Sequence, residues 1–425
     1  MSERFIPFHR PSIGEEEITE VAETLRSGWL TTGPRATRFE REFREYVGAP
    51  YSIAVNSATA GLHLALAGLQ IGPGDEVITT PMTFCATVQA ILHVRAIPVL
   101  ADIGSDGNID PEEIRKCITN RTRAIIPVHL AGLPCQMNVI WALARERGIH
   151  VIEDAAHAAG THYEGRPIGS GPAEAAAASD AVAFSFYATK NLTTGEGGMI
   201  TTHRPGLAET MRMLSLHGTS QDAWDRYGDH GNWHYDVLAQ GFKYNLSDIQ
   251  AAIGIHQLQK LEGFIERRAL YAGMYNRALA GMEEVELPPD SPSGRHAWHL
   301  YILRLNLQRL KIDRSEFIRE LRRKGVATSV HFIPIPLLHF FAQLQLPHAT
   351  CPRALSLYPR IVSLPLYPAM TEEQVHYVAQ CVREILERAR QVRFVAPGSR
   401  AAAITPRALE LPAPLREAYE KRSSY

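Results

Sequence analysis

One lysine and one aspartate follow apolar segments with the composition of β-strands, a position in which side chains can do chemistry. Lys190 lies in the segment FSFYATKNLTTGEGG, residues 184–198, where an apolar run passes into a glycine-rich loop. Asp154 lies in the segment EDAAH, residues 153–157, at the end of another such run. A lone lysine after a strand is usually a solvated surface residue, and a lone acid there is often only a cap or an ion-pair partner. Because ligands of open α/β sheets collect at the carboxyl ends of strands, we expect both side chains in one site.

A third segment has the composition of an anion-binding turn. NSATAGL, residues 56–62, joins an apolar strand to a helix and places small hydroxyl residues and free backbone N–H groups at the helix N-terminus. Such a terminus suits a phosphate dianion, because its N–H groups and its dipole both favour negative charge. An ordinary Ser or Thr cap at the start of the helix is the alternative interpretation.

A lysine, a carboxylate and a phosphate cradle at three strand ends are the parts that hold pyridoxal 5′-phosphate (PLP). Lys190 would form the Schiff base with the cofactor aldehyde and then move a proton between substrate and cofactor, and burial should lower its pKa. Asp154 would keep the ring nitrogen protonated, because an opposite charge in contact favours the charged form. Phe84, in the segment PMTFCAT at residues 81–87, either stacks on the ring or is a core aromatic residue.

Other enzyme classes have no support from short motifs. The sequence contains no GxGxxG after a strand, no GxxxxGK[ST], no HExxH and no GxSxG. These absences argue against a nucleotide-fold dehydrogenase, a P-loop enzyme, a zinc protease and a hydrolase with a nucleophile elbow. The 18 histidines show no metal-ligand spacing, so no metal is expected.

Short apolar, β-branched runs alternate with amphipathic helical stretches over about residues 50–200. This pattern predicts an α/β fold with a mostly parallel sheet covered on both faces. Helices are expected after Asp110, which has capping-box spacing to Glu113, and over residues 138–147, which end at Gly148. Strands are predicted at residues 52–55, 76–80, 97–100, 124–128, 150–153, 181–185 and 199–202.

The pattern changes after a long predicted helix over residues 247–280. A separate α+β unit is expected there, with strands at residues 299–305 and 328–331, a helix at 313–324 and a final helix opened by the capping box Thr371 to Gln374. We therefore predict a large domain over residues 1–260 and a small C-terminal domain over 261–392. Residues 393–425 are expected to form a weakly ordered tail and residues 173–178 a surface insertion.

Composition excludes some partners. The 425 residues carry 44 Lys and Arg against 45 Asp and Glu, a net charge of 44 − 45 = −1, which argues against nucleic-acid binding. No stretch has the pattern of a membrane span or of a signal peptide. The five cysteines contain no CxxC pair, which fits a reducing compartment. We expect a cytoplasmic protein that binds neither nucleic acid nor membrane.

Five segments of the chain resemble, in their sequence and in their order, the DegT/DnrJ/EryC1/StrS family of nucleotide-sugar aminotransferases. The resemblance extends to about residue 390 and implies the PLP-dependent aspartate aminotransferase type fold, fold type I. The segments are GWLTTGP at residues 28–34, SATAGLH at 57–63, EDAAH at 153–157, FSFYATKNLTTGEGG at 184–198 and GFKYNLSD at 241–248.

The resemblance implies roles for individual residues. Lys190 would be the Schiff-base lysine, Asp154 the partner of the ring nitrogen, and His157, where many relatives have Gln, the neighbour of the ring hydroxyl. Asn245 would reach the cofactor phosphate of the neighbouring subunit, which implies a homodimer with shared active sites. The phosphate in its own subunit would be held by Ala58, Thr59 and Ser185, and the substrate candidates are Trp29, Thr31, Arg226 and His331. For His331 a packed structural role is the alternative.

Within the family, the chain is most similar to the branch that acts at C4 of UDP-linked 4-ketosugars, which includes enzymes that make 4-amino-4-deoxy-arabinose for lipid A. The similar segments are SATAGLH, the pair His217–Gly218, residues 222–226 and residues 296–301; Phe84 departs from the arabinose enzymes, which have Trp. The resemblance implies L-glutamate as amino donor and pyridoxamine 5′-phosphate (PMP) as intermediate. The alternatives are a 3-aminotransferase on a dTDP-ketosugar, a sugar dehydratase of the same fold, which would have histidine in place of Lys190, and a non-catalytic regulator.

Overall fold

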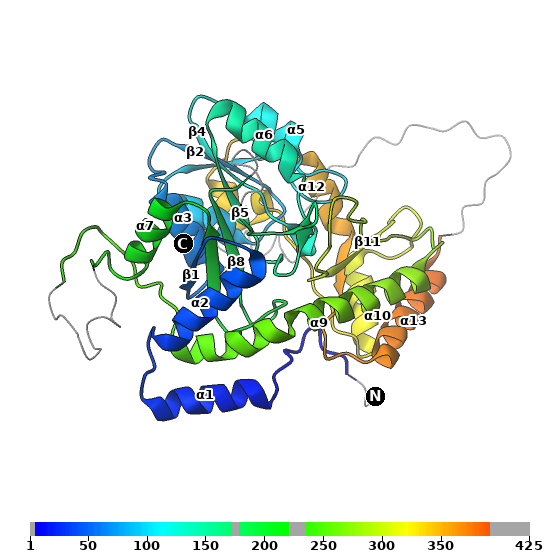
Figure 1. The fold of residues 1–425 in the computed structure, drawn as a ribbon. Coiled ribbons are helices and arrows are strands. Elements are labelled where there is room, and N and C mark those ends of the chain that lie inside the picture. The colour runs from blue at the N-terminus through cyan, green and yellow to red at the C-terminus, as the bar shows by residue number, and fades with distance from the viewer. Residues whose placement is uncertain (1–4, 172–177, 221–234, 392–425) are drawn as a thin grey trace, which may run out of the picture. The chain divides into compact units, whose positions relative to one another are not determined.

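A seven-stranded sheet forms the centre of the computed structural model, which describes residues 5–171, 178–220 and 235–391 (Figure 1). Its strands lie in the order β1 (Tyr51–Val55), β9 (Gly198–Thr202), β8 (Ala181–Ser185), β5 (His150–Asp154), β4 (Thr122–Ile126), β2 (Glu76–Thr79) and β3 (Ile97–Leu100). Only β9 runs antiparallel to its neighbours. The mostly parallel sheet is thus confirmed, and each strand lies within two residues of its predicted bounds.

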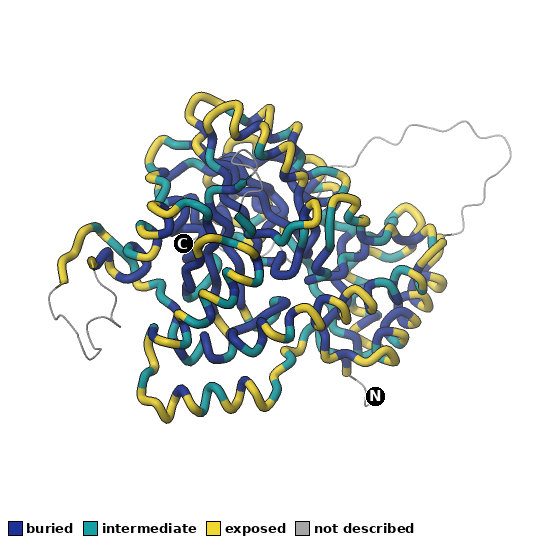
Figure 2. The backbone as a smooth tube through the Cα atoms, viewed as in Figure 1, coloured by how far each residue is buried: buried dark blue, intermediate teal, exposed yellow. Residues whose placement is uncertain are grey.

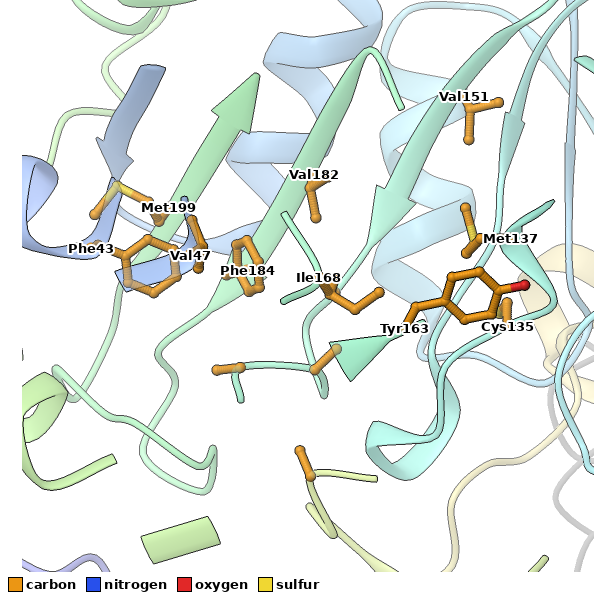
Figure 3. Close-up of a cluster of buried hydrophobic side chains, with 14 of the residues drawn as sticks. Phe43, Val47, Cys135, Met137, Val151, Tyr163, Ile168, Val182, Phe184 and Met199 are labelled. Atoms are coloured by element: carbon orange, nitrogen blue, oxygen red, sulfur yellow. The ribbon is translucent and has the colours of Figure 1, made fainter. Parts of the chain in front are cut away.

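Helices cover both faces of this sheet. One face packs against α3 (Ala58–Gly68), α4 (Cys85–His93) and α7 (Pro205–Ser215). The other packs against α2 (Pro34–Val47), α5 (Pro111–Cys117), α6 (Met137–Arg147) and α9 (Asp248–Leu279). Successive residues of each strand enter opposite cores, because side chains alternate across a sheet. In β8, Val182 and Phe184 lie in one core (Figure 3). Ala181 and Ala183 of the same strand lie in the other core.

A second, three-stranded antiparallel sheet follows in the C-terminal part. It consists of β10 (Val285–Glu286), β11 (Tyr301–Leu305) and β12 (Ile361–Leu364), and it packs against α10 (Arg314–Arg323) and α13 (Glu372–Ala389). The long helix α9 supplies residues to both the main core and this second core. Buried residues accordingly recur along its length (Figure 2). Residues up to Arg390 form one compact unit. The predicted domain boundary near residue 260 lies inside α9 and stays a prediction.

The helix α1 and several short elements complete the described part of the chain. They are α1 (Glu15–Ser27), η1 (Leu130–Gly132), β6 (His162–Tyr163), β7 (Arg166–Pro167), η2 (Ile335–Leu337), α11 (His339–Gln343), α12 (Pro352–Leu357) and η3 (Tyr358–Arg360). No helix among the described residues is both long enough and apolar enough to cross a lipid bilayer. The predicted tail and nearly all of the predicted insertion lie outside the described residues.

Two predicted strands and one predicted cap differ from the structure. Residues 328–331 form no strand, because only Ser329 pairs there, with Ser363 of β12. The strand predicted from 299 begins at Tyr301, because the carbonyl of His299 accepts from Arg268 and the N–H of Leu300 donates to Ala131, not to a neighbouring strand. Asp110 caps α5 through the N–H of Glu112, without the capping box, because the Glu113 carboxylate binds Lys116 and Arg353 instead.

Candidate active site

Four neighbouring strands bring the predicted site residues to one edge of the main sheet. Gly198 of β9 pairs with Val55 of β1 on one side and with Ser185 of β8 on the other. Asp154, the last residue of β5, pairs with Ala183 of β8. The loop between β8 and β9, which carries Lys190, leaves and re-enters the sheet at this same edge. Pairing register therefore gathers groups that lie far apart in the sequence.

The turn after β1 is a helix N-terminus of the predicted kind. Ser57 has extended backbone and accepts a hydrogen bond at its Oγ from the N–H of Ala60, 3.1 Å away. The hydroxyl is thus an ordinary cap, as the alternative interpretation proposed. The first N–H groups of a helix have no acceptor within it, and here they belong to Ala58 and Thr59, both half-buried. Cap and anion site are compatible, because they use different N–H groups.

Gly198 lets strand β9 approach this turn closely. A Cβ at this position would lie 2.7 Å from the carbonyl oxygen of Phe184, 2.7 Å from the carbonyl carbon of Ser57 and 2.8 Å from the nitrogen of Ala58. All three are backbone atoms, which cannot turn aside as a flexible side chain can. The glycine is therefore a requirement of the cradle geometry, a role that its place in a glycine-rich loop did not reveal.

The Asp154 carboxylate is buried, and both of its oxygens accept hydrogen bonds. Oδ1 accepts from the N–H of Ala156 at 3.1 Å, and Oδ2 accepts from Oγ1 of Thr87 at 2.8 Å. Burial raises the pKa of Asp154, while these two hydrogen bonds and the charge of Lys190 lower it. The carboxylate is held in one orientation at the end of β5.

The charges of Lys190 and of this carboxylate affect the pKa values of each other. Burial lowers the pKa of its amine from 10.5 to about 8, and the Asp154 charge raises it in partial compensation. The loop behind the lysine is fixed by Asn191, whose Nδ2 donates to the carbonyls of Ala159 and Ala297 at 3.2 and 3.1 Å. An amine with this pKa can gain and lose a proton near neutral pH.

His157 is buried next to the same lysine. Its Nδ1 accepts a hydrogen bond from the N–H of Ala131 at 3.2 Å, which assigns the ring proton to Nε2. Burial, with the charges of Lys190 and His331, holds the pKa of His157 well below its usual range, so the ring is neutral. The imidazole is stacked on Phe332 at 5.6 Å and lies 4.4 Å from the ring of His299. It can donate one hydrogen bond into the site.

Phe84 and His331 line the site from two other segments. Phe84 is 61% exposed and lies 6.2 Å from the Phe332 ring, so it is not a core aromatic residue. His331 is half-buried, with Nδ1 2.8 Å from Oγ of Ser363 and its ring stacked on Phe8 at 5.6 Å. Burial and the charge of Lys190 lower the pKa of His331 to about 4. It is anchored by Phe8 and Ser363 and lies close enough to Lys190 for that charge to act on its ring.

The segments GWLTTGP and GFKYNLSD bind each other. The Asn245 amide donates to Oγ1 of Thr32 at 2.7 Å, and the Asn245 backbone pairs with Val55 at the end of β1. The buried Asp248 carboxylate accepts the N–H groups of Gly33 and Ala36 and so caps α2. Asn245 thus lies beside the turn that follows β1 in its own chain, and a role toward a neighbouring subunit stays a prediction.

The remaining substrate candidates are placed less centrally. Trp29 is half-buried, with its Nε1 donating to the carbonyl of Thr32 at 3.1 Å. Thr31 is exposed, and its carbonyl accepts the N–H of Asp248 at 3.1 Å. Arg226 lies outside the described residues.

Sequence reasoning missed several residues that the structure brings into the site. His299 and Phe332 pack on His157, and Thr87 binds Asp154. For the two aromatic rings no signal was available, because their neighbours come from another part of the chain. For Thr87 a signal existed in its place in the segment that follows the strand predicted at residues 76–80, at the sheet edge where ligands collect.

The lowered pKa of Lys190 predicts that its amine reacts at lower pH than an ordinary lysine. In cofactor-free protein we expect half-maximal acetylation of Lys190 near pH 8 rather than 10.5, because a lower pKa makes the neutral amine available at lower pH. Asp154→Asn should move the midpoint further down, because it removes the charge that raises the pKa. Peptide mass spectrometry measures the modification, with exposed Lys311 as reference for the reagent. A midpoint above pH 10, or an upward shift in the variant, contradicts the prediction.

The close approach at Gly198 predicts a specific binding defect. Gly198→Ala should weaken PLP binding by about tenfold or more, because relieving such overpacking costs about 1–3 kcal/mol and must displace the turn. Gly206→Ala is the matched control, since a Cβ at Gly206 meets nothing within 4 Å. Fluorescence titration with PLP measures both. Unchanged affinity in Gly198→Ala would show that the cradle does not bind the phosphate.

Comparisons with known proteins agree with this geometry. Residues 11–383 match the DegT/DnrJ/EryC1/StrS aminotransferase family. The spore coat polysaccharide biosynthesis protein SpsC of Bacillus subtilis is 47% identical over 388 residues, which cover 91% of this chain and 98% of SpsC.

Solved structures of similar proteins have the same fold. The putative sugar aminotransferase Spr1654 of Streptococcus pneumoniae, in its PMP form, has a TM-score of 0.83 at 35% identity and covers 90% of this chain and 99% of its own. Helicobacter pylori PseC, an aminotransferase involved in the biosynthesis of pseudoaminic acid, has a TM-score of 0.82 at 28% identity and covers 91% and 100%. The chain is therefore a member of the DegT/DnrJ/EryC1/StrS aminotransferase family, with the fold of the sugar aminotransferases.

Proposed function

We propose that this protein transfers an amino group from L-glutamate to C4 of a UDP-linked 4-ketosugar, with PLP as cofactor and PMP as the form that carries the amino group. The observation that carries the proposal is the gathering of Lys190, Asp154 and the N-terminus of α3 at one sheet edge. The similar Streptococcus pneumoniae protein is known in a PLP form and a PMP form, which supports the cofactor.

The residues present fit PLP. The turn at Ala58 and Thr59 offers N–H groups to a phosphate, and Ser185 lies one strand away, paired with Gly198. Asp154 offers an oriented carboxylate to a ring nitrogen, and neutral His157 offers its Nε2–H to a ring hydroxyl. When bound, PLP supplies an aromatic ring that withdraws electrons from the reacting carbon of the substrate.

The side chains of the chain perform the proton transfers and the positioning. Lys190 would bind the cofactor and, once released, would move a proton between the substrate carbon and the cofactor in each half-reaction, which its pKa of about 8 allows. Asp154 keeps a positive charge on the ring nitrogen by contact with its own negative charge. Phe84, which is exposed at the start of α4, is proposed to cover one face of the ring.

The sugar side of the site is proposed from neighbouring groups. His331 is proposed to contact the ketosugar, because it is anchored at Ser363 and lies close enough to Lys190 for that charge to lower its pKa. Trp29 and Thr31 are proposed for the nucleotide side. A homodimer in which Asn245 reaches the partner's phosphate is part of the same proposal. The UDP group and C4 rest on the similarity of SATAGLH, His217–Gly218 and residues 296–301 to that branch of the family.

A second candidate function is a 3-aminotransferase on a dTDP-ketosugar. A dehydratase of the same fold is disfavoured by Lys190, because those relatives have histidine at this position. A purely regulatory protein is disfavoured by the complete set of Lys190, Asp154 and the glycine-rich loop. The SpsC protein acts in polysaccharide biosynthesis by its name, which fits an aminated sugar for a glycan.

Covalent attachment tests the lysine assignment. Borohydride reduction of the purified protein with PLP should add one phosphopyridoxyl group, and mass spectrometry of peptides should locate it on Lys190. Lys190→Ala should fold, lack the adduct and lose transamination by at least about 10³-fold, because it removes both the attachment point and the proton carrier. Full turnover in Lys190→Ala would refute the assignment, and Lys243→Ala serves as the control.

A substrate panel tests the acceptor. Incubation with L-glutamate and 4-keto or 3-keto sugars linked to UDP or dTDP should give an aminated product from the UDP-4-ketosugar at the highest kcat/KM. Mass spectrometry of the sugar nucleotide and measurement of 2-oxoglutarate follow both half-reactions. A higher kcat/KM with a dTDP-3-ketosugar would favour the second candidate function instead.

A further inference from the structure

We propose that Thr87, supported by Thr83, is a positioning residue that holds the Asp154 carboxylate charged and in one orientation toward the ring nitrogen of the cofactor. This inference rests on the proposed function, because it concerns the group that Asp154 serves. Thr87 would not touch the reacting atoms, and it would act only through Asp154.

The contacts form a short chain of hydroxyls. Oγ1 of Thr87 lies 2.8 Å from Oδ2 of Asp154 and 2.7 Å from Oγ1 of Thr83. Both threonines are buried, with 1% and 2% of their surface exposed. They belong to the segment that leaves the carboxyl end of β2 and opens α4, so they approach β5 across the sheet edge. The contact joins residues that are 67 positions apart.

The chemistry of the groups fixes the direction of these bonds. An ionised carboxylate only accepts hydrogen bonds, so the single proton of Thr87 points to Asp154. The hydroxyl of Thr83 must then donate to Thr87, since the Thr87 proton is already used. Each donor strengthens the next along such a chain, which favours the charged form of the acid.

A local role for Thr87 is the main alternative. A hydroxyl in the first turn of a helix commonly bonds a backbone carbonyl three or four residues earlier. Thr87 does lie 3.3 Å from the carbonyl of Phe84, but its contact with Asp154 is shorter by half an ångström. The better geometry belongs to the carboxylate, so the local bond is the secondary one.

The surroundings of Asp154 make this donor important. Burial raises the pKa of the acid, while the Thr87 hydroxyl and the N–H of Ala156 lower it. The charged or titratable groups that face Asp154 are Lys190 from the β8–β9 loop and His129 and Cys135 from the segment after β4. Of the side chains, only Thr87 is recorded within hydrogen-bond distance of this carboxylate in the described part of the chain. A hydrogen bond at contact distance is directional, whereas the more distant charges are not, so Thr87 can also orient the acid.

A comparison of two cofactor forms isolates this role. We would titrate the full-length cofactor-free protein with PLP and with its carbocyclic analogue, in which a C–H group replaces the ring nitrogen. Thr87→Val, which keeps the shape and loses the hydroxyl, should weaken PLP binding about 10- to 100-fold, the range for a hydrogen bond to a charged group. It should weaken the analogue less than about threefold, because the analogue makes no charged contact with Asp154. Thr87→Ser should restore the wild-type preference for PLP.

Two further variants keep the test decisive. Thr83→Val leaves the contact with Asp154 in place and should reduce the preference for PLP by a smaller factor, about two- to fivefold. If the thermal unfolding of Thr87→Val shows that this variant does not fold, the PLP preference of Thr83→Val tests the proposal in its place. Thr201→Val is the matched control: it removes another fully buried hydroxyl, which donates to the carbonyl of Gly169 at 2.9 Å, and should leave the preference unchanged.

The outcomes separate this inference from the proposed function. An equal loss of affinity for PLP and for the analogue in Thr87→Val, or no loss in either threonine variant, would overturn the positioning role. Those results would leave the proposed function intact as long as wild-type protein binds PLP at Lys190. If wild-type protein binds neither compound, the proposed function fails first.

Discussion

The pairing of Gly198 with both Val55 and Ser185 is the constraint on which the site depends. This one residue fixes the register of three strands, and with it the positions of the α3 turn and of the loop that carries Lys190. Because a slip of one residue in a strand sends every side chain to the opposite face, the core and the site are specified together. The core packing of β8 stabilises the same register. Val182 and Phe184 are buried in one core, and Ala181 and Ala183 are buried in the other.

The electrostatics of the site follow from burial at this edge. Lys190 and Asp154 are opposite charges that share a poorly solvated space, and each moderates the shift that burial imposes on the pKa of the other. The nearby imidazoles of His157, His299 and His331 are neutral, because burial and neighbouring positive groups lower their pKa values. The site therefore combines two opposite charges with neutral polar and aromatic walls. Such an arrangement suits a cofactor whose own ring and phosphate are charged.

Positioning in this protein comes from groups that the reaction does not consume. Asn191 ties the lysine loop to the carbonyls of Ala159 and Ala297, and Asp248 caps α2 while it holds the segment around Gly33. Thr87 does the same for Asp154. In each case a buried polar side chain makes two or more hydrogen bonds, which limits the motion of a neighbouring functional group.

The sequence by itself determined the strands of the main sheet, the capping box of α13, the place of Lys190 and Asp154 after two strands, and the family to which the chain belongs. These features depend on local patterns, such as apolar runs, caps and contiguous motifs, which the chain carries within a few residues. Only the tertiary structure decided that Phe84 is exposed, that residues 328–331 form no strand, that Gly198 touches the turn at Ser57, and that Thr87 binds Asp154. Each of these depends on contacts between segments far apart in the sequence, and such contacts are fixed by sheet register and packing rather than by neighbouring residues.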